Sequence, residues 1–160
     1  MKQQVVSIGY GRNLFYAGND ERSRQRTIAA AVGRLDLVIF THRRDGLAAE
    51  RVDDSLHLHP TNSRARWLMP WDAFWIGVRL MRQSVFDRPQ LTSQDPFESG
   101  LVAYLLSLCF WAPLIVQEHA DVFSGPYWRT ESLGNRVRYW VGRVLLTRAT
   151  RIRVVSARSR

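Results

Sequence analysis

The chain has 160 residues, of which 46% are apolar and 23% charged, and this is enough for one globular domain with its own core. The net charge of +9 comes almost entirely from arginine, because Lys2 is the only lysine, and it suggests anionic partners such as phosphates, phospholipid headgroups, sugar nucleotides or nucleic acid. The single cysteine, Cys109, excludes an internal disulfide and fits a reducing compartment, and the first residues show no signal-peptide pattern. We therefore expect a cytoplasmic protein.

Apolar patterning predicts strands that alternate with helices along the whole chain. In order, the predicted elements are a strand at 4–10, a helix at 21–33, strands at 35–42 and 55–60, a helix at 70–83, a strand at 89–96, a helix at 97–111, a strand at 113–119, a helix at 128–150 and a strand at 151–157. This alternation predicts one α/β domain of three layers over residues 1–160, in which a mostly parallel sheet of about six strands carries helices on both faces.

One uncharged stretch, 99–117, is long enough to span a bilayer. Pro113 interrupts it, and Glu98 and Glu118 close its two ends. Before Pro113 the pattern suits a helix, and after it the β-branched residues suit a strand. We therefore expect no transmembrane helix here.

The loop after the first predicted strand is rich in glycine and arginine, and it reads "GYGRNLFYAGNDERSRQR" (9–26). Gly11 and Gly18 permit positive φ and close backbone approach. The arginines that could contact phosphate are Arg12, Arg22, Arg24 and Arg26. The start resembles a dinucleotide-binding fingerprint, but the third glycine is missing and the helix begins too late. Two interpretations stay open: a flexible loop over a ligand cleft, or a merely solvated loop.

A second polar group follows the buried strand 113–119, in the segment "QEHADVF". Ligands of open α/β sheets bind beyond the carboxyl ends of the strands. His119 lies just past that end, where an imidazole could hydrogen-bond a sugar hydroxyl or act as an acid or base. The alternative is a loop histidine without a role.

Two further patterns have competing interpretations. His57 and His59 alternate on a strand and share a face, which could bind a metal, but no third ligand is evident nearby, so we expect no metal. Trp67, Trp71 and Trp75 recur at helical spacing between arginines, which fits either a helix packed on the sheet or an interfacial helix at a membrane surface. In the helix 128–150 the apolar residues expected to share one side are Leu133, Val137, Val141, Val144 and Leu145, opposite a solvated basic face.

Taken together, "LTSQDPFESGLVAYLL", "PLIVQEHADVF" and "RATRIRVVS" resemble the amino-terminal, acceptor-side domain of family 4 glycosyltransferases of the GT-B type. The resemblance covers essentially the whole chain. It implies a Rossmann-like domain that faces a second, donor-binding domain across a cleft, and sugar transfer from a nucleotide sugar to a glycan or lipid-linked acceptor with retained configuration and no metal or other cofactor.

The resemblance also implies site residues. His119 would hydrogen-bond the transferred sugar and Asp121 would orient the loop, although Ala120 stands where the family commonly has glycine. The substrate-binding residues that it implies are Gly11, Arg12, Gly18, Arg24, Gln94, Asp95, Gln117 and Glu118. Asp95 would in addition cap the next helix.

The donor half is expected to lie elsewhere, because no glutamate pair in this chain has the family's seven-residue spacing. We therefore expect the chain to be inactive without a donor-binding domain, in cis or as a separate chain. The competing hypothesis is a non-catalytic binding module for an anionic glycan, a membrane surface or a partner protein. Any membrane contact is expected to be peripheral, at the inner face. Nucleic acid is not an expected partner.

Overall fold

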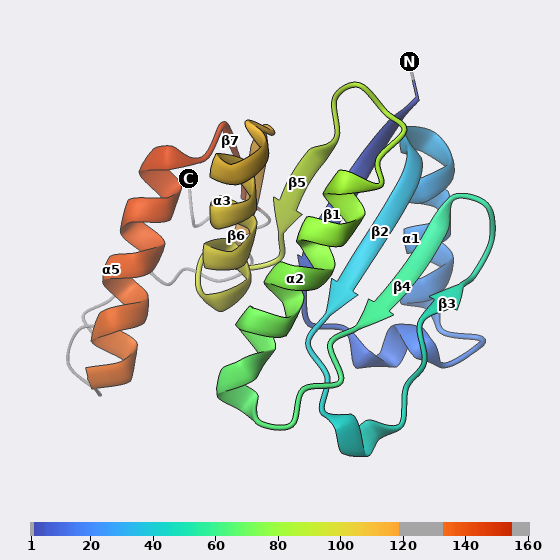
Figure 1. The fold of residues 1–160 in the computed structure, drawn as a ribbon, viewed down its shortest axis with the longest axis horizontal. Helices are drawn as coiled ribbons and strands as arrows, with labels where there is room; N and C mark the ends of the chain where they lie inside the picture. The colour runs from blue at the N-terminus through green and yellow to red at the C-terminus, as the bar shows by residue number, and fades with distance from the viewer. Residues whose placement is uncertain (1, 119–132, 155–160) are drawn as a thin grey trace.

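The computed structural model, in which residues 2–118 and 133–154 are described, is an α/β domain built on a seven-stranded sheet (Figure 1). The strands are β1 (Gln3–Gly9), β2 (Gly33–Ile39), β3 (Glu50–Arg51), β4 (Leu56–Pro60), β5 (Gln90–Ser93), β6 (Leu114–Glu118) and β7 (Arg151–Val154). They are ordered β3-β4-β2-β1-β5-β6-β7, and every neighbouring pair is parallel except β3 and β4.

Within residues 2–118 and 133–154, four α-helices and three short 3₁₀ helices connect these strands. The α-helices are α1 (Asp20–Val32), α2 (Met69–Arg82), α3 (Glu98–Phe110) and α5 (Leu133–Arg148). The 3₁₀ helices are η1 (Arg12–Phe15), η2 (Arg43–Asp45) and η3 (Arg66–Leu68). The predicted alternation of strands and helices is confirmed, but the sheet has one strand more than the six expected. The extra strand, β3, is only two residues long and pairs with the edge strand β4, so no periodic pattern announces it.

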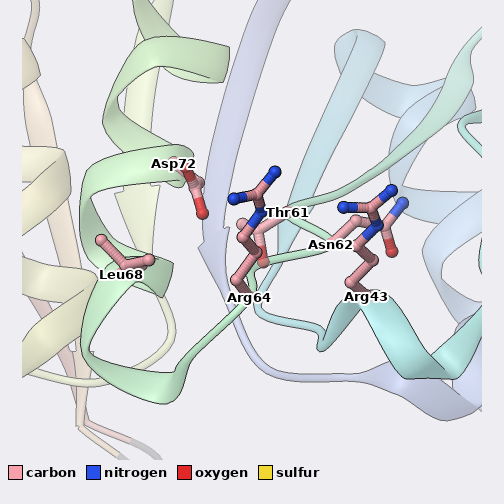
Figure 2. Close-up of a pocket in the computed structure, with 6 residues that line it drawn as sticks. All are labelled: Arg43, Thr61, Asn62, Arg64, Leu68 and Asp72. Atoms are coloured by element: carbon pink, nitrogen blue, oxygen red, sulfur yellow. The ribbon is translucent and has the colours of Figure 1, made fainter.

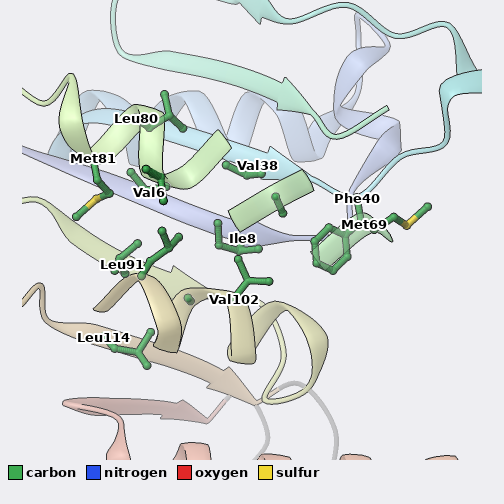
Figure 3. Packing of buried hydrophobic residues seen from close by; sticks show 14 of the residues in the cluster. Val6, Ile8, Val38, Phe40, Met69, Leu80, Met81, Leu91, Val102 and Leu114 are labelled. Atoms are coloured by element: carbon green, nitrogen blue, oxygen red, sulfur yellow. The ribbon is translucent and has the colours of Figure 1, made fainter. Parts of the chain in front are cut away.

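Side chains of the central strands alternate between two cores, one on each face of the sheet. Val6 and Ile8 of β1 pack with α2 and α3 in the larger core, which Figure 3 shows from close by. Val5 of β1 and Leu35 and Leu37 of β2 pack with α1 in the smaller core. The sheet is therefore covered on one face by α1 and on the other by α2 and α3.

The uncharged stretch 99–117 is divided between two elements. Helix α3 ends at Phe110, and β6 begins at Leu114 in the middle of the sheet's β5–β7 half. In the described part of the chain, no helix has the length and apolar character needed to cross a bilayer.

The contact between α2 and α3 decides which side of α2 faces the core. A Cβ placed on Gly77 would lie 2.4 Å from Leu106 Cδ1, so the two helices approach as closely as they do only because position 77 is glycine. Met69 and Ala73 are buried on the same side of α2 as Gly77. The interpretation that this helix packs on the sheet is therefore confirmed. The packing side is the one that carries Gly77, however, and Trp71 and Trp75 are exposed.

The expected apolar side of the last helix is also only partly buried. Leu145 is buried, but Val137 and Val144 are exposed. Tyr139, which was not among the expected core residues, is buried instead. The helix is rotated from the predicted orientation because its contacts come from α3, whose Gly100 lies against Leu145 Cδ1.

Two leucines of α3 test this packing. Leu106 is fully buried and Leu108 is 55% exposed, so we expect Leu106→Ala to lower the free energy of unfolding by about 2–5 kcal/mol and Leu108→Ala to change it by less than about 1 kcal/mol. Urea denaturation followed by circular dichroism measures both. Equal losses for the two variants would mean that α3 faces the core differently.

Candidate functional site

The order of the strands reverses at β1. From β1 the chain builds β2 and β4 on one side and β5, β6 and β7 on the other. In open α/β sheets the loops that leave the two central strands diverge at such a point, and the crevice between them at the carboxyl ends of the strands is where ligands bind. We therefore expect a ligand site between the loops that follow β1 and β5.

These two loops are held together by a contact that requires glycine. A Cβ on Gly9 would lie 2.3 Å from Gln94 Oε1, so the Gln94 side chain occupies the space that any other residue would fill. Gln94 Oε1 accepts a hydrogen bond from the Tyr10 backbone N–H (2.8 Å), and the Gln94 backbone N–H donates to the Ile8 carbonyl (3.0 Å). The two loops are therefore fixed relative to each other.

Asp95 organises the start of α3. Its Oδ1 accepts a hydrogen bond from the Phe97 backbone N–H (2.8 Å), and its Oδ2 accepts one from Ser99 Oγ (2.7 Å). The expected cap at Asp95 is wrong, because the N-cap residue of α3 is Phe97. Asp95 lies two residues before it, and its bonds close the turn that leads into the helix. Burial raises the pKa of Asp95, and the nearby Glu98 carboxylate raises it further, against the opposing effect of the two hydrogen bonds.

Tyr10 stands beside Asp95. Its ring meets Phe40 edge to face with 5.0 Å between centroids. Burial, followed by the charges of Glu98 and Asp95, raises the pKa of the Tyr10 phenol. Tyr10 therefore keeps its proton at neutral pH and presents both a hydrogen-bonding hydroxyl and an aromatic surface.

A groove of about 630 Å³ runs between α1 and the sheet from this crevice, and we call it the α1 groove. At the carboxyl edge of the sheet it is lined mainly by polar groups, and towards the amino edge mainly by apolar ones, with Gln90 as a polar exception. Its lining residues are Val5, Ser7, Tyr10, Glu21, Arg24, Gln25, Ile28, Val32, Leu35, Leu37, Gln90, Thr92, Gln94, Asp95, Ile115, Gln117 and Arg153. The groove brings together four of the expected substrate-binding residues, Arg24, Gln94, Asp95 and Gln117. Gln117 Nε2 donates to Thr92 Oγ1 (3.3 Å), which holds it against the floor of the groove.

The remaining expected site residues lie elsewhere. Gly11, with φ of 144°, and Gly18, with φ of 82°, shape the loop on either side of η1 but do not line the groove. Arg12 forms an ion pair with Asp45 of η2 (3.1 Å). Glu118 is the last residue of β6, so its backbone reaches the carboxyl edge. His119 and Asp121 lie outside the described residues.

The other arginines of this segment hold the chain together. Arg22 pairs with Glu50 of β3 and also donates to the Leu14 carbonyl (3.1 Å). Arg26 pairs with Asp53 in the turn after β3 (3.0 Å). Only Arg24 of this group lines the α1 groove.

A second concavity at the carboxyl edge was not expected from the sequence, and we call it the arginine hollow (Figure 2). It measures about 420 Å³ and is lined by Arg43, Thr61, Asn62, Arg64, Leu68 and Asp72. Figure 2 shows the side chain of Arg43 rising from η2 and that of Arg64 from the segment after β4, both toward the same side. Neither guanidinium makes an ion pair or hydrogen bond with any residue that the structure describes, so both are available to an anion.

The floor of the arginine hollow is fixed by hydrogen bonds. Asn62 has φ of 48°, and its Nδ2 donates to the Leu47 carbonyl (2.7 Å) while its backbone N–H donates to Thr41 Oγ1 (2.9 Å). Thr61 Oγ1 in turn donates to the Thr41 carbonyl (3.0 Å). The only sequence signal for this site is two arginines placed shortly after the ends of β2 and β4, which is too common a pattern to identify it alone.

His57 and His59 of β4 lie close to a third potential ligand, Asp36 of the neighbouring strand β2. Asp36 Oδ1 lies 2.9 Å from His59 Nε2 and 3.5 Å from His57 Nδ1. Each of the three residues offers one potential ligand atom, and these atoms all lie within 4.8 Å of one another. The expectation that no third ligand is near was wrong, because Asp36 comes from the neighbouring strand β2. Asp36 Oδ2 accepts hydrogen bonds from Gln4 Nε2 (2.7 Å) and Arg34 Nε (2.8 Å). A guanidinium already neutralises this carboxylate and would repel a cation, so we assign the cluster to an internal ionic network.

Comparisons of the chain with protein-family models and with curated proteins gave no match.

The Asp36 network predicts an acid-dependent stability. Burial alone would raise the pKa of Asp36, but hydrogen bonds from His59, Arg34 and Gln4 outweigh it and lower the pKa from 3.8 to about 2. The ionised carboxylate therefore stabilises the fold above about pH 4, by on the order of 2 kcal/mol, and this stabilisation is lost as the pH falls toward about 2. Asp36→Asn should have a lower free energy of unfolding than the wild type at neutral pH. This difference, which we call the stability gap, should become smaller as the pH falls from about 4 to about 2.

Urea denaturation at a series of pH values measures this gap. The matched control is Asp54→Asn, whose carboxylate is 98% exposed and pairs only with Arg51 at the surface, so its gap should stay near zero. A gap for Asp36→Asn that does not change with pH would show that the charge of Asp36 does not stabilise the fold.

Proposed function

We propose that this chain is the Rossmann-like, acceptor-binding half of a retaining glycosyltransferase of the GT-B type. One observation carries the proposal. The segment after β5 that resembles this family meets the loop after β1, where the resemblance implies further substrate-binding residues, at the point where the strand order reverses. Two loops that lie 84 residues apart are joined there through Tyr10 and Gln94. The six parallel strands lie in the order β4-β2-β1-β5-β6-β7, and β3 is an antiparallel addition at one edge. If these six strands are numbered one to six along the chain, the order is 3-2-1-4-5-6, which is that of a doubly wound sheet.

The chemistry of the α1 groove supports a sugar ligand. Sugars are bound by planar polar side chains that can donate and accept at once, and by aromatic surfaces. Near the crevice, Gln94 and Gln117 supply amides that can donate and accept, and Arg24 supplies further donors. Tyr10 supplies the aromatic surface. Asp95 adds a carboxylate that is held in place by Ser99.

The proposed mechanism assigns transfer to a cleft between this edge and a donor-binding domain. In this proposal His119 hydrogen-bonds the transferred sugar and Asp121 orients the loop, and β6, which precedes them, runs to the same edge of the sheet as β1 and β5. The only cofactor-like molecule needed is the nucleotide-sugar donor. The described residues offer an acceptor wall, so this chain alone is expected to bind acceptor without transferring sugar.

The arginine hollow favours an acceptor that carries a phosphate or other anion. Arg43 of η2 and Arg64 of the segment after β4 both line the hollow, which suits an anion with several oxygens better than a single carboxyl group. A phosphorylated glycan or a lipid-linked phosphate acceptor has such a group. The alternative proposal, a binding module without catalysis, uses the same two concavities but needs no donor-binding domain.

Gln117→Ala tests the α1 groove. We expect a glycan that binds the wild-type chain to bind this variant about fivefold or more weakly, because one hydrogen bond is worth about 1 kcal/mol, while the melting temperature stays unchanged. Ligands are first found on an array of neutral and phosphorylated oligosaccharides, and affinities are then measured by calorimetry. The matched control is Gln83→Ala, an exposed glutamine at the end of α2. The proposal fails if no glycan binds, or if a dinucleotide such as NAD binds this groove instead.

A double variant tests the arginine hollow. Arg43→Gln/Arg64→Gln should weaken binding of a phosphorylated sugar by at least about tenfold, since hydrogen bonds to charged groups contribute about 1.5–3 kcal/mol each, and should leave binding of its neutral counterpart unchanged. Arg44→Gln/Arg88→Gln makes the same change of net charge at exposed sites outside the hollow. Equal losses for the two double variants would mean that overall charge, not this site, attracts the phosphate.

A further inference from the structure

Three helices expose apolar side chains on the side that faces away from the sheet. Helix α3 contacts α2 on one flank and α5 on the other, so the three lie side by side in one layer (Figure 1). The exposed apolar residues of this layer, which we call the outer helical face, are Trp67, Trp71 and Trp75 at α2, Leu101, Leu105 and Leu108 on α3, and Val137, Trp140 and Val144 on α5. They recur at spacings of three and four residues, so each helix presents a stripe and not a scattered set.

Tryptophan dominates this face. Trp67, Trp71 and Trp75 are 78%, 59% and 52% exposed, and Trp140 is 62% exposed. Trp71 and Trp75 touch edge to face with 5.7 Å between their ring centroids. Four exposed tryptophans on adjoining helices are far more than a solvated surface requires, and apolar surface of this extent marks an interaction site.

A fifth tryptophan ends α3. Trp111 is 95% exposed and has φ of 53°, a left-handed conformation that is unfavourable for a bulky residue. Because the Trp111 ring is almost fully exposed, it contributes no buried apolar surface to the fold. A partner that accepts the ring would account for the arrangement.

Arginines are interspersed with these apolar residues. The arginines of the three helices are Arg79, Arg82, Arg136, Arg138, Arg143 and Arg148. The acids within the same helices are Asp72 and Glu98, and Glu98 is already paired with Arg138. Arg143 lies over the Trp140 ring, 5.9 Å from its centroid. The outer helical face therefore combines tryptophan with a net positive charge.

We infer that the outer helical face binds the surface of an anionic phospholipid bilayer. Tryptophan prefers the boundary between headgroups and acyl chains, and arginine can extend its apolar stem along that boundary while its guanidinium meets lipid phosphates. Protein–protein interfaces also favour tryptophan and arginine, so the choice of partner rests on charge. These three helices carry six arginines against two acids, one of which is already paired with Arg138, and this excess suits anionic lipid phosphates. The helices lie on the membrane and do not cross it.

This binding does not depend on sugar transfer. The outer helical face is on the opposite side of the sheet from α1, and hence from the α1 groove. Substitutions on this face should therefore leave glycan binding in the groove unchanged.

Vesicle co-sedimentation tests the inference. The full chain should sediment with vesicles that contain about 30% phosphatidylglycerol at about 50 mM salt, and at least about tenfold more weakly at about 500 mM salt, because salt screens the attraction of arginine to lipid phosphates. Vesicles of phosphatidylcholine alone should bind it much more weakly. Tryptophan fluorescence should shift to shorter wavelength in the bound sample.

Two exposed tryptophans give the decisive variant. Trp71→Gln/Trp75→Gln should lower the affinity for anionic vesicles by at least about tenfold without changing the circular dichroism spectrum, because neither ring is buried. Tyr16→Gln/Val85→Gln, which changes two exposed apolar residues outside this face, is the matched control and should bind like the wild type. Arg79→Gln/Arg82→Gln should weaken binding by about fivefold for each arginine removed.

Three results would overturn the inference. The first is absence of sedimentation with anionic vesicles at low salt. The second is sedimentation that the tryptophan substitutions leave unchanged. The third is a chain that does not bind vesicles but forms a dimer that Trp71→Gln/Trp75→Gln abolishes, which would assign the face to a second copy of the chain.

Discussion

The contact between Gly9 and Gln94 fixes the part of the fold on which the proposed site depends. Because Gly9 has no Cβ, the Gln94 side chain can lie directly against the end of β1 and accept the Tyr10 backbone N–H. This contact bridges the two loops that diverge where the strand order reverses. It adds to the pairing of Ile8 with Ser93 and to the backbone hydrogen bond from Gln94 to Ile8, and it fixes Tyr10 and Gln94 at the polar end of the α1 groove. The absence of a side chain at Gly9 therefore allows Gln94 to take its place at the carboxyl edge of the sheet.

The high positive charge of the chain is divided between two uses. Arg12, Arg22, Arg26 and Arg34 form ion pairs that hold the first loop, α1 and β2 in place. Among the described residues, the two arginines of the arginine hollow and all those of the outer helical face except Arg138 have no acidic partner. Leu68 and Asp72 line the hollow, and the tryptophans of α2 begin beside them, so a phosphate held there would lie near the proposed membrane surface. Acceptor binding and membrane binding are thus compatible in one orientation of the domain.

The sequence predicted the elements better than it predicted their partners. In the described part of the chain, continuous apolar runs and helical spacing located every strand and helix of more than three residues, apart from the short 3₁₀ helix η1, because local periodicity follows burial directly. The same periodicity does not say which side of a helix faces the sheet: the tryptophan stripe of α2 is as regular as its buried side, and Gly77 decides between them. Asp36 was not connected to His57 and His59 for a similar reason, since strand neighbours are set by topology.

The candidate site was predictable only in part. Arg24, Gln94, Asp95 and Gln117 were expected from the sequence, and they do line one groove. Arg43 and Arg64 were not expected, because an arginine that lacks an ionic partner cannot be told from a paired one by its letter alone. Arg22 and Arg26 illustrate the converse, since acids 27 and 28 residues away occupy them.

The central claim is that the carboxyl edge between β1 and β5 binds a sugar acceptor, and amide chemical shifts test it most directly. In a titration of the isotopically labelled chain with a bound glycan, the account predicts that the largest shifts fall on Tyr10, Thr92, Gln94 and Gln117. Shifts centred on Asp36, His57 and His59, at a different part of the sheet, would contradict it.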